Sequence, residues 1–134
     1  AKDLYGDEID SDWRFNYQLE EKYYGYYYRT LKYYKQTENK SEGKISNRTL
    51  PMIRMSEVYY IAAEAIFDTN PKEAQGYLEL VKKGRGISKK FDNVTNKSEF
   101  INLLVIDARR EFLGEGQIFY MHKRLNRLMP ASSF

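Results

Sequence analysis

The chain has 134 residues, of which 42% are hydrophobic and 31% are charged, a balance typical of a folded globular domain rather than a disordered segment. It contains no cysteine, which excludes disulfides, thiolate chemistry and cysteine-based zinc sites. The formal net charge of +3 falls short of the strongly basic balance that nucleic-acid binding favours, so we expect no nucleic acid among its partners.

The first fifty residues carry no helical pattern. Residues 1–11 are polar and acidic, which predicts a linker or loop. Eight of the thirteen tyrosines fall between Tyr17 and Tyr34, and such aromatic density favours extended structure. We therefore predict strands or extended segments at Phe15–Leu19 and Tyr26–Tyr34, with an exposed loop at Thr37–Asn47.

From Pro51 the pattern becomes helical. Apolar residues recur at spacings of three and four, which predicts a helix that buries Met55, Val58, Tyr59, Ala62, Ala65 and Ile66. Asn70 then suits the N-cap of a second helix, Pro71 its first position, and Glu73 a capping box. Residues 54–84 are therefore predicted to form a tetratricopeptide-like helical hairpin.

The second helix carries three kinds of signal. Its apolar face comprises Ala74, Tyr77, Leu78 and Val81. Gly76 lies inside it, and we interpret this glycine as a point of close approach to a neighbouring helix. Either Gly84 or Gly86 should supply the left-handed residue that ends the helix.

A third helix should begin at Asn96, with Glu99 completing its cap. It is apolar on most sides, which indicates a central position in the fold. Gly114 and Gly116 should interrupt it before a short helix over Gln117–Leu125, with Phe119, Tyr120 and Leu125 facing inward.

Charged residues stand beside these apolar stripes, where a buried charge needs a partner. We predict that they form a structural network of interhelical ion pairs: Arg54, Glu57, Glu64, Arg110, Glu111, Glu115 and Arg124. The alternative is a pair of carboxylates acting as acid and base, as in glycosidases. Each of these acids has an arginine nearby in the sequence, which favours the structural interpretation.

No set of catalytic residues is evident. His122 is the single histidine, which excludes multi-histidine metal sites, and its charged neighbours indicate a surface position. We predict no enzyme activity, no metal site and no cofactor.

The tyrosine-rich segment offers two interpretations. Aromatic rings can stack on sugars and phenolic hydroxyls can bond them, so Trp13, Tyr24, Tyr26 and Tyr28 are candidate ligand-binding residues. In an extended chain Tyr24, Tyr26 and Tyr28 would share one side, and Tyr23 and Tyr27 the other. The same rings could instead serve only as packing.

The order of these motifs resembles the SusD/RagB family. The resemblance covers about residues 12–124 and rests on Asp12-Trp-Arg14, Ile53-Arg-Met-Ser-Glu57, Ala62-Ala-Glu-Ala65, Asn70-Pro71, Tyr77-Leu78 before Arg85-Gly86, and Arg109-Arg-Glu-Phe112 with Glu115-Gly116 and Lys123-Arg124. It implies the carboxy-terminal portion of a non-catalytic, surface-exposed outer-membrane lipoprotein of Bacteroidota. The lipid anchor is expected to lie outside this chain.

By the same resemblance, such a protein binds an oligosaccharide or other nutrient and delivers it to a SusC-like TonB-dependent transporter. Its partners would be that transporter, the nutrient and the remainder of its own full-length chain. The rival hypothesis is an intracellular tetratricopeptide-like scaffold for protein–protein interaction. In either case we predict a mainly α single-domain fragment, with residues 1–50 extended, aromatic-rich or looped and residues 51–128 helical.

Overall fold

The computed structural model describes residues 2–22, 24, 27–32, 52–90 and 93–129. Within these residues the chain is mainly helical, with a short two-stranded antiparallel sheet near the N-terminus, which confirms the predicted fold class. The elements, with η1 a 3-10 helix, are α1 (Lys2–Tyr5), η1 (Gly6–Glu8), α2 (Trp13–Gln18), β1 (Leu19–Lys22), β2 (Tyr27–Thr30), α3 (Met55–Ile66), α4 (Pro71–Lys83), α5 (Lys97–Glu111) and α6 (Gln117–Arg124).

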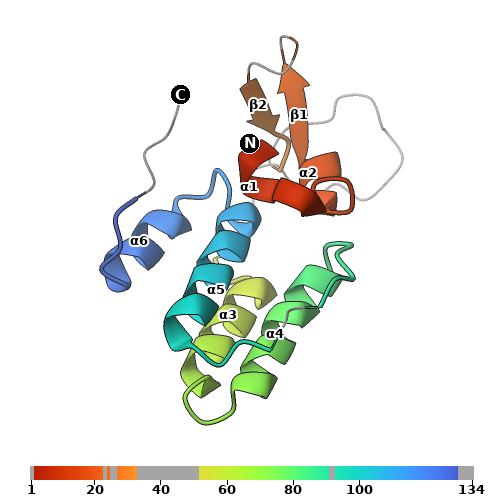
Figure 1. Cartoon of the computed structure of the whole chain (residues 1–134). Coiled ribbons are helices and arrows are strands. Elements are labelled where there is room, and N and C mark those ends of the chain that lie inside the picture. The colour runs from red at the N-terminus through yellow and green to blue at the C-terminus, as the bar shows by residue number, and fades with distance from the viewer. Residues whose placement is uncertain (1, 23, 25–26, 33–51, 91–92, 130–134) are drawn as a thin grey trace.

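Helices α3 and α4 form the predicted hairpin, and α5 packs against both of them (Figure 1). The hydrophobic core lies where these three helices meet. Phe67 at the end of α3 stacks on Phe100 of α5 with ring centroids 4.3 Å apart, and Leu78 and Leu104 are fully buried. The apolar residues of α5 make it the central helix, as predicted.

Local capping explains where two of these helices begin. The Asn70 side chain accepts a hydrogen bond from the Glu73 amide at 3.2 Å, and its own amide donates to the Glu73 carboxylate at 2.9 Å. At the start of α5, Asn96 accepts from the Glu99 amide at 3.1 Å. Both N-caps are confirmed, because these side chains satisfy helix amides that have no partner within the helix.

The predicted buried face of α3 is correct only in part. Tyr59 and Ile66 are partly buried and pack against the core, whereas Met55, Val58 and Ala65 are exposed. The residues that α3 and the position after it bury are Ser56, Tyr60, Ala63 and Phe67. Small side chains let α3 approach its neighbours, and Tyr60 suits the interface because its hydroxyl donates to Asp107 on α5 at 2.6 Å. The hydrogen bond from the Tyr60 hydroxyl therefore favours burial of this face of α3 over the face that carries Met55 and Val58.

The N-terminal predictions also need correction. Residues 2–8 form α1 and η1 rather than a linker, and Tyr5 is 1% exposed. The predicted extended segment at Phe15–Leu19 is mostly helical, because Asp12 caps α2 by accepting from the Arg14 amide at 2.9 Å. This cap, a local hydrogen bond, prevailed over the aromatic preference for strands.

Strands β1 and β2 pair in antiparallel register from Leu19 opposite Thr30 to Lys22 opposite Tyr27. The prediction of a strand in the tyrosine-rich segment therefore holds for Tyr27–Thr30. Tyr24 instead lies in the turn between the strands with a positive φ of 55°. The predicted alternation of tyrosines along one extended chain fails at this turn, while Tyr23, Tyr26 and the loop at Thr37–Asn47 lie outside the described residues.

Two glycines show what the end of α4 requires. Gly86 has a φ of +86° and supplies the left-handed residue after the helix, whereas Gly84 has a φ of −65°. A side chain at Gly86 would also collide with Trp13 and with the Ser11 carbonyl. Apart from the adjoining backbone of α4, no atom of the described residues lies within 4 Å of the place that a Cβ at Gly76 would occupy, so the predicted close approach there is wrong.

Helix α6 begins after Gly114 and Gly116, both with a φ of +79°, as predicted from the glycine pair. Its orientation differs from the prediction, because Phe119 and Tyr120 are exposed and Leu125 is only partly buried. His122 is 5% exposed rather than on the surface, and its Nδ1 lies 3.0 Å from the Leu128 carbonyl oxygen. Helix α6 thus turns a histidine inward and two aromatic rings outward.

Among the described residues, no helix is long and apolar enough to cross a membrane.

Candidate functional site

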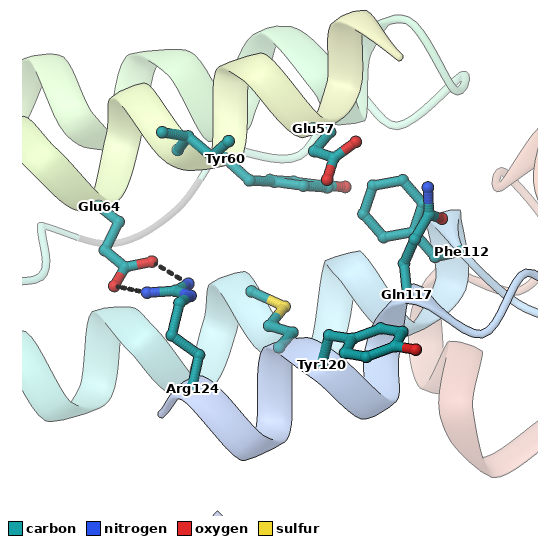
Figure 2. A pocket seen from close by; sticks show the side chains of 9 residues that line it. Glu57, Tyr60, Glu64, Phe112, Gln117, Tyr120 and Arg124 are labelled. Atoms are coloured by element: carbon teal, nitrogen blue, oxygen red, sulfur yellow. Dashed lines mark hydrogen bonds and ion pairs between the residues drawn. The ribbon is translucent and has the colours of Figure 1, made fainter. Parts of the chain in front are cut away.

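A pocket of about 260 Å³ opens between α3 and α6 (Figure 2). Its wall comprises Glu57, Tyr60, Ile61, Glu64, Phe112, Gln117, Tyr120, Met121 and Arg124. The volume lies just below the roughly 300–1,000 Å³ of pockets for drug-sized ligands, which leaves room for one small ring. Polar groups at both ends and apolar groups between them make this a candidate binding site.

One end of the pocket is closed by an ion pair. Glu64 on α3 accepts two hydrogen bonds from the Arg124 guanidinium on α6, at 2.6 and 2.7 Å. The Glu64 hydrogen bonds raise the pKa of Arg124 above its ordinary value. Since the pair is partly exposed, we attribute positioning rather than much stability to it.

The opposite end carries Glu57 and Gln117, one from each helix (Figure 2). Among the described residues, no cation pairs with the Glu57 carboxylate, and the Gln117 Oε1 atom is buried without a hydrogen-bond partner. Because that oxygen is buried, the acceptor that this end of the pocket offers to a ligand is the Glu57 carboxylate.

Aromatic rings line the space between the two ends. Tyr60 and Phe112 are buried and meet edge to face with centroids 5.8 Å apart. Burial raises the pKa of Tyr60 well above its ordinary value, and its hydroxyl is committed to Asp107. Tyr120 is 71% exposed, so it is the ring most accessible to a ligand.

A second polar cluster lies inside the protein, between the N-terminal segment and the C-terminal end of α5. We call it the buried ion cluster, and it comprises Asp12, Arg14, Lys32, Arg54, Arg85, Asp107, Glu111 and Glu115. Arg14 is 1% exposed and donates to Asp12 and to Asp107, each at 2.8 Å. Burial alone would lower the pKa of Arg14, but these two carboxylates raise it.

Glu111 is the anion that the three arginines of this cluster share. Arg85 reaches it at 2.6 and 2.8 Å, Arg54 at 3.1 Å and Arg14 at 3.4 Å. Burial would raise the pKa of Glu111, but the arginines outweigh it and hold the pKa at about 2. A carboxylate held ionised in this way cannot donate a proton near neutral pH.

Glu115 pairs with the fourth cation of the cluster, Lys32, and shares Arg54 with Glu111. Lys32 donates to its carboxylate at 2.7 Å, and Arg54 donates to the same oxygen. Burial lowers the pKa of Lys32, while Glu115 opposes that effect. The cluster therefore ties residue 32, the start of α3 and the end of α5 to one another.

The structure separates the predicted network into distinct places. It brings Arg54, Glu111 and Glu115 together in the buried ion cluster, and it places the Glu64–Arg124 pair at the α3/α6 pocket. Arg110 instead donates to the Leu4 carbonyl at 2.9 Å and to Glu8, so it holds the N-terminal segment. The Glu57 carboxylate belongs to the pocket and to no ion pair among the described residues.

Sequence reasoning omitted five residues from the network, namely Asp12, Arg14, Lys32, Arg85 and Asp107. The first two had a detectable signal, because an aspartate two residues before an arginine can both cap a helix and pair with the arginine. The others come from segments with no such local pattern. Lys82, close to Arg85 in the sequence, pairs with Glu8 at 2.6 Å and thus also holds the N-terminal segment.

The aromatic candidates do not form a single surface. Tyr24 is fully exposed in the β1–β2 turn, and Trp13 is 53% exposed. Tyr28 is partly buried, lies 5.5 Å from the Phe15 ring and donates to Glu21 at 3.1 Å. Tyr26 lies outside the described residues. Within the described parts of the chain, no group of histidine, aspartate and glutamate residues is arranged to hold a metal ion.

Comparison with known proteins gives one match. The model of the SusD family matches residues 14–127. That range contains most of the buried ion cluster and the whole α3/α6 pocket. No curated protein and no solved structure matches the chain.

Proposed function

Because the chain belongs to the SusD family, we propose that it binds an oligosaccharide or other nutrient at the cell surface and delivers it unchanged to a SusC-like TonB-dependent transporter. The SusD family is a family of generally non-catalytic nutrient-binding proteins. The observation that carries the proposal is the match over residues 14–127, nearly the whole chain.

The structure supports this proposal by giving the matched motifs a common role as a scaffold. Arg14, Arg54, Arg85, Glu111 and Glu115 come from four separate sequence motifs and meet in the buried ion cluster. The eight residues of the whole cluster comprise four cations and four anions, so their charges balance. We propose that they stabilise the fold and leave ligand binding to other residues.

The α3/α6 pocket is the ligand site that we favour. An accessible Tyr120 ring beside hydrogen-bond acceptors suits a sugar, whose apolar face stacks on aromatic rings while its hydroxyls donate. Trp13, Tyr24 and Tyr28 are retained as candidates for a second contact surface. The intracellular scaffold gains no support from the family match.

A glycan array probed with the intact protein tests the binding function. We expect retention of at least one class of oligosaccharide, with the Tyr120→Ala variant weakened and its melting temperature unchanged. Failure to retain any glycan or other small nutrient would contradict the proposal.

Transport needs a separate test. Co-expression with a SusC-like transporter from the same genome, followed by affinity purification from detergent-solubilised outer membranes, should recover both proteins together. Recovery of the chain from the cytoplasm alone would favour the scaffold hypothesis instead.

A further inference from the structure

We propose that the α3/α6 pocket selects a sugar that carries a protonated amine, a hexosamine with a free ammonium group. This inference rests on the proposed function and names the class of ligand for it. The ammonium would lie at the end formed by Glu57 and Gln117, with the sugar ring against Tyr120 (Figure 2).

The first argument is charge complementarity. The pocket wall holds two carboxylates and one guanidinium, and the Glu64–Arg124 pair neutralises one carboxylate. Glu57 remains as a partly buried negative charge with no cationic partner among the described residues. A ligand ammonium would supply the missing charge, whereas a ligand carboxylate would be repelled.

The second argument is hydrogen bonding. The carboxylate of Glu57 only accepts hydrogen bonds and pairs with no cation among the described residues, whereas the Oε1 atom of Gln117 is buried and lies out of reach of a ligand. A protonated amine has three donors and no acceptor, so it matches this carboxylate better than a hydroxyl does. The Glu57 carboxylate thus distinguishes an amine from a neutral sugar.

The third argument comes from the aromatic walls. Tyr60 and Phe112 are buried, and the Arg54 guanidinium already lies over the Phe112 ring at 5.8 Å from its centroid. Tyr120 is 71% exposed, and the negative face of such a ring attracts organic cations. The Glu57 carboxylate and the Tyr120 ring therefore favour ammonium in two independent ways. The volume of about 260 Å³ limits the ligand inside the pocket to about one sugar ring.

The proposal is tested by titrating the intact protein with D-glucosamine, D-glucose and N-acetyl-D-glucosamine. Calorimetry measures the affinity for each sugar, and NMR of the tyrosine rings reports where it binds. The three sugars share a ring, but only glucosamine carries the ammonium. We expect glucosamine to bind about fivefold more tightly than the other two, as a partly exposed ion pair allows.

Two variants locate the effect. Glu57→Gln keeps the size of the side chain and should remove the preference for glucosamine, while Asp7→Asn removes an exposed carboxylate outside the pocket and should preserve it. Tyr120→Ala should weaken the binding of all three sugars. Tyr17→Ala is its matched control, because Tyr17 is 72% exposed and does not line the pocket.

Equal affinity for the three sugars, or an unchanged preference in Glu57→Gln, would overturn the inference. Retention of an oligosaccharide on the array without any shift of the Tyr120 signals would overturn it as well, while leaving nutrient binding intact. Absence of binding in both the array and the titrations would overturn the inference and the proposed function together.

Discussion

Glu111 is the residue on which the buried ion cluster depends most. It is 1% exposed and faces three arginines, so removing its charge would leave Arg14, Arg54 and Arg85 without their common partner. We expect Glu111→Gln to lower the free energy of unfolding by about 3 kcal/mol, as measured by urea denaturation.

The Glu64–Arg124 pair provides the control for this prediction. It has the same chemistry but is partly exposed, so Glu64→Gln should cost less than about 1 kcal/mol. Equal losses in the two variants would contradict the view that burial gives the cluster its importance.

Glu111 should also make the protein sensitive to acid. Its folded pKa of about 2 lies below its ordinary value of 4.5. The stabilisation from this group is therefore complete above pH 4.5 and is lost as the pH falls toward about 2, because the unfolded chain takes up the proton first. The lost stabilisation should be about 3 kcal/mol.

Urea midpoints recorded between neutral pH and pH 2 would show this loss. The Glu111→Gln variant lacks the titrating group and should lose less stability over the same window. Parallel curves for the two proteins would assign the acid sensitivity to other carboxylates.

At the scale of elements, the sequence predicted those helices whose ends are encoded by neighbouring residues. Asn70 and Asn96 each cap a helix through a residue three positions later, and Gly86 ends α4 through its own backbone freedom. Such signals act within one helical turn, so they can be recognised in the sequence without knowledge of the fold.

Predictions from the sequence were wrong where contacts between distant segments determine which residues are buried. The buried face of α3 depends on Tyr60 meeting Asp107, which is 47 residues away. The burial of Arg14 likewise depends on α5, and the α3/α6 pocket requires the turn at Gly116 to set the direction of α6. No local pattern contains this information, and so the pocket went unpredicted.

The end of α4 offers a test of backbone requirements. Gly86→Ala places a Cβ 2.7 Å from the Ser11 carbonyl and against the Trp13 indole, at a φ of +86°. We expect it to destabilise the protein by about 2 kcal/mol in thermal or urea denaturation.

Gly76→Ala is the matched control, because it adds the same methyl group inside α4 with no atom within 4 Å. It should stabilise the protein by up to about 1 kcal/mol through helix propensity. A loss of stability in Gly76→Ala would contradict the open space at that position.

For the molecule as a whole, we predict that it performs no hydrolysis. The carboxylates of the buried ion cluster are fixed by cations, and Glu64 at the pocket is paired with Arg124. Glu64, the second carboxylate of the pocket, is held by the Arg124 guanidinium, which leaves Glu57 without a carboxyl group that could act as its general acid. A reducing-sugar assay on a polysaccharide panel should show no release above the blank, and release abolished by Glu57→Gln would refute this.

The N-terminal segment is joined to the rest of the molecule largely by charge. Tyr5 packs beneath Arg110, Glu8 pairs with Lys82 and Arg110, and Arg14 pairs with Asp107. The main hydrophobic core runs from Tyr60 to Phe112 without these residues. The residues that close this contact are far apart in the chain.

This arrangement sets the order of events during synthesis. Arg14 leaves the ribosome 93 residues before Asp107, its partner. At bacterial elongation rates the wait is roughly five to twenty seconds, during which the segment has its cations and anions but no helix to receive them. The first part of this chain to be made can therefore complete its ion pairs only after α5 has followed it.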